Sequence, residues 1–133
     1  MDLRNKTGYV MVPIFIYRSP AYARRLKLLE TLLPDSRLLR PDKMFNSDEE
    51  WLEEIDNIIL KVDFGVLVSD NSLIVGAGCF LECCSFYAIS KPVFYLNHIN
   101  RVLTQDFEFT RLPKYDRRFY AKVEINKERA IAK

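Results

Sequence analysis

Residues 63–96 read DFGVLVSDNSLIVGAGCFLECCSFYAISKPVFYL, and this stretch decides the fold. Its two apolar runs, residues 64–68 and 93–96, show no polar alternation, which is typical of strands covered on both faces in a parallel sheet. The segment between them, residues 79–90, is apolar nearly all the way round and predicts a buried helix. The stretch therefore predicts one β-α-β unit with a right-handed crossover.

Glu82 is the one ionisable carboxylate of this predicted helix. Removing a carboxylate from water without a partner costs several kcal/mol or forces it to take up a proton, so its position needs a reason. One reason is electrostatic, because the N–H groups of a first helical turn stabilise an acid. The other is functional, because a helix that follows a parallel strand starts at the edge where open α/β sheets bind ligands. A functional acid must be accessible to its ligand, so under the second reason we expect solvent to reach Glu82.

The preceding segments extend this unit into a larger sheet. A first strand is predicted at residues 14–17, because Pro13 cannot donate to a central ladder and the strand therefore starts after it. Ser19 is predicted to cap a helix from residue 20 to about residue 33. Residues 36–40 predict a modest strand near an edge, and residues 41–46 predict a loop. Ser47 and Glu50 form a capping box that opens a second helix towards residue 62.

Together these elements predict a three-layer α/β fold of the flavodoxin or Rossmann type. We expect four or five parallel strands in the order 2-1-3-4, the fifth at the end, with helices on both faces. Residues 97–104 are predicted to lead into a short helix. Residues 1–133 are expected to form a single domain, frayed at residues 1–8 and 126–133.

The composition argues against several classes of function. Twenty basic and eighteen acidic residues give a net charge of +2, so we expect no nucleic-acid polymer as a partner. The sequence has no apolar run long enough for a membrane span and no signal-peptide core, so we expect a soluble, cytoplasmic protein. Cys79, Cys83 and Cys84 lack zinc-like spacing, and no metal or other cofactor is expected. They are read as small buried hydrophobes, the alternative being a nucleophile paired with His98.

Polar residues gather at the predicted carboxyl ends of the first and third strands, which the strand order places side by side. Arg18, beside a helix N-terminus, suits a phosphate or a carboxylate, although an exposed arginine is the commoner outcome. Asp70 is the acid that this geometry places best. The loop at residues 71–78 holds Gly76 and Gly78, which admit close approach of a sugar or phosphate, although a lone GxG is a weak signal.

Gly78-x-x-x-Glu82, followed by Ala88 and Lys91-Pro92-Val93, resembles the D-x-G-x-x-x-E-x-G-x-A…G-K-P-V stretch of the nucleoside 2-deoxyribosyltransferases and the related deoxynucleotide N-hydrolases. The resemblance spans roughly residues 14–96, and its last third is distinctive. In that family the glutamate attacks C1′ of the sugar, which implies that Glu82 is the nucleophile.

Further site residues are implied by the same resemblance. The family's turn after the first strand lines the nucleoside pocket, which implies substrate contacts from Tyr17, Arg18 and Ser19, although a cap serine is usually only a cap. An aspartate before the third strand helps to position the sugar or base, and Asp63 occupies its place, although such an aspartate is more often a turn former. Either Asp63 or Asp70 is expected to protonate the leaving base.

Transferases of this family complete their site with an asparagine from a neighbouring subunit. Asn97 and Asn100 are the candidates here, which implies a homodimer or a higher homo-oligomer.

We therefore predict an enzyme that cleaves or transfers the N-glycosidic bond of a small-molecule nucleoside or nucleotide. Two departures leave alternatives open, because Gly76 stands where the family has an aspartate and Cys84 where it has a second glycine. The first alternative is a non-catalytic nucleotide-binding or protein-interaction module of the same fold. The second is a TIR-like domain that cleaves NAD with a glutamate, and the third is a structural role.

Overall fold

Four parallel strands form the centre of the main sheet. They are β1 (Thr7–Met11), β2 (Arg37–Leu39), β3 (Phe64–Leu67) and β5 (Val93–Asn97), and β6 (Val102–Thr104) joins β5 antiparallel to give the order β2-β1-β3-β5-β6. The computed structural model describes residues 2–12, 19–45, 47–68, 74–75, 77–105, 107 and 110–111. Two further short strands, β4 (Ile74–Val75) and β7 (Thr110–Arg111), pair with each other in parallel.

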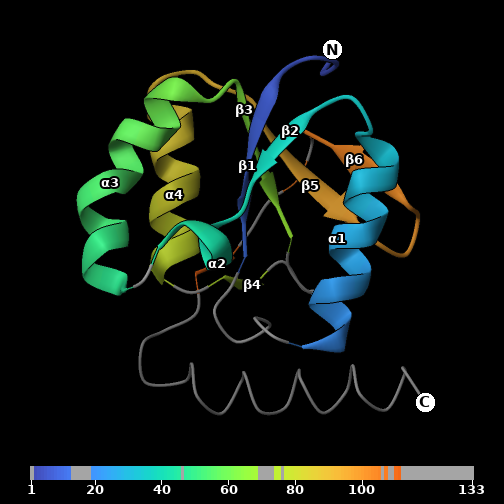
Figure 1. Ribbon diagram of the computed structural model, residues 1–133, viewed down its shortest axis with the longest axis horizontal. Coiled ribbons are helices and arrows are strands. Elements are labelled where there is room, and N and C mark those ends of the chain that lie inside the picture. Colours follow the sequence, from blue (N-terminus) through green and yellow to red (C-terminus); the bar gives the residue numbers. More distant parts are fainter. Residues whose placement is uncertain are drawn as a thin grey trace.

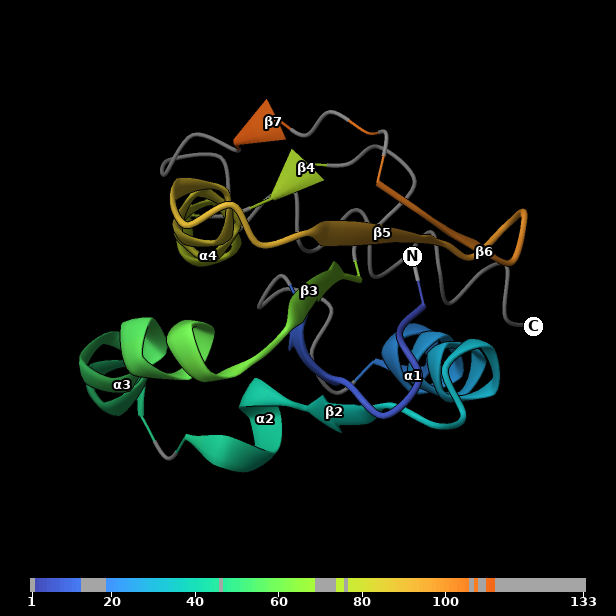
Figure 2. The same ribbon diagram turned by 90° about the horizontal axis from the view of Figure 1, so that it is seen from above.

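Helices cover both faces of the main sheet, as the sequence predicts. Helix α1 (Pro20–Leu32) lies on one face, and α3 (Asp48–Lys61) and α4 (Ala77–Ala88) lie side by side on the other (Figure 1). The short helix α2 (Pro41–Met44) connects β2 to α3. The turned view shows the same three layers, with β4 and β7 on the β5 side of the molecule (Figure 2). The three-layer α/β fold, with its flavodoxin-like strand order, is thus confirmed.

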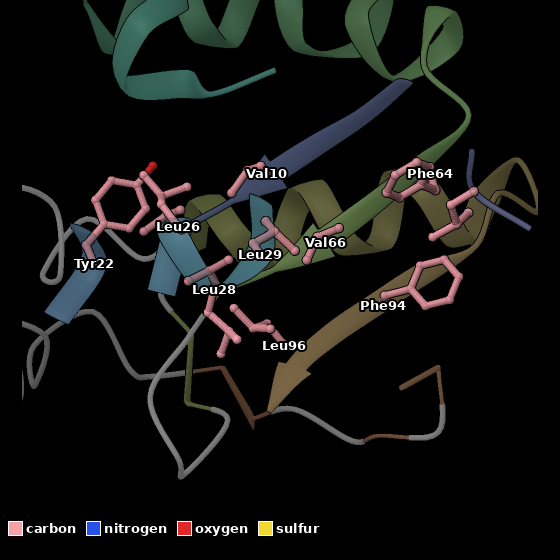
Figure 3. Packing of buried hydrophobic residues seen from close by; sticks show 12 residues of the cluster. Val10, Tyr22, Leu26, Leu28, Leu29, Phe64, Val66, Phe94 and Leu96 are labelled. Carbon is pink, nitrogen blue, oxygen red and sulfur yellow. The ribbon is translucent and has the colours of Figure 1, made fainter. Parts of the chain in front are cut away.

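Alternate residues of the central strands supply the two halves of the core. Val10, Val66 and Leu96 face α1, where Leu26 and Leu29 pack against them (Figure 3). The residues between them face α3 and α4 and pack with Ile55, Ile59, Cys83 and Phe86; they are Tyr9, Met11, Leu67 and Val93. Because both faces are buried, these strands read as continuous apolar runs.

Gly65 lets α4 approach β3 closely. A Cβ atom at this position would lie 2.9 Å from both the Met11 Cε and the Phe86 Cε2 atoms. The missing side chain therefore sets the distance at which the helix that carries Glu82 rests on the sheet.

Two helix starts form for the reasons that the sequence gives. The Ser19 hydroxyl accepts a hydrogen bond from the Tyr22 N–H at 3.1 Å, and Pro20 takes the first helical position. The Ser47 hydroxyl accepts from the Glu50 N–H at 3.1 Å and starts α3. Both predicted caps are confirmed, and so is the β-α-β unit of β3, α4 and β5.

Four local predictions are wrong. The first strand, β1, precedes Pro13 instead of following it, and residues 14–17 lie outside the described residues. Residues 2–8 are not frayed, because Leu3 is buried and the Asn5 N–H donates to the Asp35 carbonyl at 2.9 Å. The predicted loop at 41–46 contains α2, which starts at a proline. Residues 97–104 form a turn and the antiparallel strand β6 instead of a helix.

Within the part of the chain that the structure describes, no helix has the length and apolar character needed to cross a membrane.

Candidate functional site

Glu82 lies on the face of α4 that packs against the sheet and α3. It is the sixth residue of a helix that begins at Ala77, so it belongs to the second turn and not to the first. The dipole of the first turn therefore does not account for it. Only 4% of the residue is exposed, so the expectation that solvent reaches Glu82 is wrong.

Trp51 contacts the Glu82 carboxylate directly, and Tyr9 acts on its ionisation. The Trp51 Nε1–H donates to Oε2 at 3.1 Å from the first turn of α3, where the Ser47 carbonyl accepts the Trp51 backbone N–H at 3.1 Å. Tyr9 is fully buried in β1, and its hydroxyl favours the charged carboxylate and so lowers the pKa of Glu82. The acid of α4 is thus held by α3, and a residue of β1 acts on its ionisation.

Burial dominates the electrostatics of this acid. It raises the pKa of Glu82 from 4.5 to about 7, and the hydrogen bonds from Tyr9 and Trp51 work in the opposite direction. A carboxyl group with this pKa exchanges its proton near neutral pH, as general acids and general bases require, and it is ionised in part of the molecules at pH 7, as a carboxylate nucleophile requires. Perturbation by desolvation is also a recognised mark of functional residues.

The thiols beside Glu82 are poorly suited to nucleophilic chemistry. Burial raises the pKa of Cys83 to about 12 and raises that of Cys79, and the nearby Glu82 charge adds to both effects. Cys79 and Cys83 are buried hydrophobes as predicted, whereas Cys84 is exposed.

His98 lies on the opposite face of the sheet from these cysteines and contacts α1. Its Nε2 atom is 3.2 Å from Nη2 of Arg25, a residue only 6% exposed. Because a guanidinium only donates, Nε2 accepts, and the ring proton resides on Nδ1. Burial, with the charges of Arg25 and Arg24, lowers the pKa of His98 to about 4. The structure therefore does not pair His98 with Cys79 or Cys83.

Asp63 ties together the amino ends of two strands. Its Oδ2 accepts the Thr7 N–H at 2.9 Å, and its own N–H donates to the Thr7 carbonyl at 2.8 Å. The carboxyl end of β3 lies four residues further on, at Leu67, which is roughly 13 Å along the strand. The structure thus does not bring Asp63 to the carboxyl edge, and its carboxylate acts in the junction between α3 and β3.

The remaining predicted site residues are only partly described. Ser19 is 8% exposed and serves as the cap of α1. Asn100 is exposed in the turn between β5 and β6, where its N–H donates to Asn97 Oδ1 at 3.0 Å. Gly78 lies in the first turn of α4. Four predicted site residues lie outside the described residues: Tyr17, Arg18, Asp70 and Gly76.

No sequence pattern predicts that Tyr9 and Trp51 define the environment of Glu82. Tyr9 reads as one more member of an apolar strand, and Trp51 as the first member of the apolar stripe of α3. Each becomes a partner of Glu82 only when α3 and α4 pack together on one face of the sheet. In the described ranges, no group of three or more histidine, cysteine, aspartate or glutamate side chains could hold a metal ion.

We expect Gly78→Ala to fold normally. A Cβ atom there would lie 3.8 Å from the nearest indole atom of Trp51, which is an ordinary van der Waals contact. Alanine also favours a helix over glycine by roughly 1 kcal/mol. If Gly78 lets a sugar approach Glu82, the variant loses turnover while thermal unfolding shows unchanged or higher stability. Unchanged turnover would show that no substrate passes close to Gly78.

Comparisons of the chain with protein-family models, with curated proteins and with solved structures gave no match.

Proposed function

We propose that this protein cleaves or transfers the N-glycosidic bond of a nucleoside or nucleotide, with Glu82 as the nucleophile. The observation that carries the proposal is the buried Glu82 carboxyl, which α4 holds against Trp51 and Tyr9 and which titrates near neutral pH. A well-packed fold would be more stable with an apolar or amide side chain at this position. The retained acid is best explained by a reaction.

The proposed chemistry uses one oxygen of Glu82. This oxygen forms a bond to C1′ of the sugar while the bond from C1′ to the base nitrogen breaks, and the electron pair of that bond leaves with the base. A general acid delivers a proton to the departing base, and Asp70 is our candidate for that role. Water or a second base then attacks C1′ and gives its proton to the general acid, which the first step left ionised; the bond to Glu82 breaks, and the carboxylate is regenerated. Water gives hydrolysis, and a base gives transfer.

We expect Glu82→Gln to lower base release by about a thousandfold or more, because glutamine keeps the shape of the side chain but cannot form the ester. The measurement is chromatographic detection of free base from a panel of deoxynucleosides and deoxynucleotides. Glu53→Gln removes an exposed acid from α3 and serves as the control with wild-type rates. Undiminished base release from Glu82→Gln would overturn the nucleophile assignment.

The partners and the compartment form part of the proposal. A small-molecule nucleoside or nucleotide is the substrate, and the protein works in the cytoplasm as a homodimer or a higher homo-oligomer. Asn100 is exposed and therefore available to a neighbouring subunit. Leu81 and Tyr87 of α4 are also exposed, at 43% and 48%, and are suited to a subunit contact.

The low exposure of Glu82 favours a second candidate, a non-catalytic module that binds nucleotides or a protein partner. Substrate must reach an acid that is 4% exposed, whereas a binding module has no such requirement. Calorimetric titration that shows nucleotide binding without base release would support the second candidate. For the TIR-like alternative, the corresponding test is release of nicotinamide from NAD.

A further inference from the structure

The indole of Trp51 spans one turn of α4, from Gly78 to Glu82. Its Cη2 and Cζ2 atoms lie 3.8 and 3.9 Å from the position that a Gly78 Cβ would occupy, and its Nε1–H reaches Glu82 Oε2 at 3.1 Å. Trp51 is itself only partly buried, whereas Glu82 is 4% exposed. The two side chains come from positions 31 residues apart, so the contact is made by the packing of α3 on α4.

This contact makes the two oxygens of the carboxylate different. Oε2 accepts a hydrogen bond from an indole that is fixed by the start of α3, and a carboxylate oxygen held by a donor is a poorer nucleophile than one without a donor. A carboxylate nucleophile uses one oxygen, and the other becomes the carbonyl oxygen of the ester. An N–H donor at the carbonyl oxygen is compatible with both states, because that oxygen accepts hydrogen bonds before and after the ester forms.

We propose that Trp51 is a positioning residue that holds Oε2 of Glu82 and thereby fixes the orientation of the carboxylate for the reaction. This inference rests on the proposed function. Trp51 touches Glu82 and not the substrate, so it acts through the carboxylate. Its second effect follows from the same bond, because a donor to the charged form favours ionisation of the acid at neutral pH.

The groups that face Glu82 in the described residues come from three elements. They are the Tyr9 hydroxyl from β1, the Trp51 N–H from α3, and the Cys79 and Cys83 thiols from α4 itself. The two thiols stay neutral at physiological pH because their pKa values are raised. The Tyr9 hydroxyl and the Trp51 N–H are therefore the groups that oppose the effect of burial on the pKa of Glu82.

The first test needs no turnover. The chain has one tryptophan, so its indole N–H gives one assignable signal in a two-dimensional nitrogen-15 spectrum. We expect this signal to shift with pH at a midpoint near 7, where Glu82 ionises. The midpoint should vanish in Glu82→Gln and persist in Glu53→Gln. A midpoint that is unchanged in Glu82→Gln would overturn the coupling of Trp51 to Glu82.

The second test is the pH profile of Trp51→Phe, which keeps an aromatic ring but removes the N–H donor. Loss of the donor raises the pKa of Glu82, so we expect the rise of kcat/KM with pH to move to higher pH by about one pH unit. Activity then falls about tenfold below pH 6.5 and less than about threefold at pH 9. A structural role alone would lower the activity equally at all pH values, and that result would overturn the inference.

The two proposals fail in different ways. Base release that is undiminished in Glu82→Gln removes the proposed function and, with it, the positioning role, even if the indole signal titrates. Base release that depends on Glu82, together with a Trp51→Phe profile that overlays the wild-type profile, removes only the role of Trp51.

Discussion

We expect Glu82→Gln to raise the free energy of unfolding at pH 8 by about 3 kcal/mol and to leave it nearly unchanged at pH 4. Folding raises the pKa of Glu82 from 4.5 to about 7, so the folded chain binds this proton more tightly than the unfolded chain. The contribution of Glu82 to the free energy of unfolding is therefore fully present below pH 4.5, and it is lost as the pH rises through 7. Glutamine does not ionise and avoids this loss.

Urea denaturation at the two pH values measures this difference. Below pH 4.5 the acid is neutral in both states, so wild type and variant differ there only through the amide group. An equal gain at both pH values would mean that the variant improves packing and that the ionisation of Glu82 costs nothing. Glu53→Gln, at an exposed position on α3, should change neither value by more than about 0.5 kcal/mol.

His98 acts in the opposite direction over an overlapping range of pH. Its pKa falls from 6.5 to about 4 on folding, so the folded chain binds this proton less tightly than the unfolded chain. The contribution of His98 to the free energy of unfolding is therefore lost as the pH falls from 6.5 towards 4. His98 is partly exposed, and solvent screening reduces its effect. His98 does not affect the stability difference between wild type and Glu82→Gln at pH 8, because its ring is neutral there in both the folded and the unfolded chain.

The same substitution thus separates the two views of Glu82. A structural acid would lower stability when it is removed, because its partners would lose their hydrogen bonds. A functional acid that the fold merely tolerates raises stability when it is neutralised and abolishes the activity at the same time. Glu82→Gln measures both quantities in one protein.

Periodicity and capping residues were enough to predict most of the fold. The apolar runs of β3 and β5 and the caps at Ser19 and Ser47 are local signals, and local signals survive into the structure. Pro13 misled the prediction because a proline can end a strand as readily as precede one. The helix α2, at four residues, is too short for any periodicity to appear.

The candidate site was harder to predict than the fold. An acid alone on an apolar helix could be recognised from the sequence, but its burial depends on how α3 packs against α4. The contact with Trp51 joins two helices whose stripes each predict only a buried face. Asp63 shows the converse, because its place in a motif implied a site residue whereas its hydrogen bonds to Thr7 place it at the amino ends of β1 and β3.

Lys91 belongs to the stretch that resembles the deoxyribosyltransferases. Its ammonium group donates to three carbonyl oxygens at the end of α3, those of Ile59 at 2.8 Å, Leu60 at 2.7 Å and Val62 at 2.6 Å. These groups carry the negative end of the helix dipole and have no partner within the helix. Lys91 thereby fastens the end of α3 to the loop that leads into β5.

We expect Lys91→Met to lower the free energy of unfolding by about 3 kcal/mol, because methionine keeps the apolar stem but leaves these carbonyls without a charged donor. Lys61→Met, in the exposed last turn of the same helix, is the matched control and should cost less than about 1 kcal/mol. Hydrogen exchange should show faster opening of the last turn of α3 in Lys91→Met only. Equal losses in the two variants would contradict the capping role. Because Lys91 acts at the end of α3 and not beside Glu82, we expect the folded variant to keep the proposed rate of base release. This lysine would then serve the fold, whereas Glu82 would serve the proposed reaction.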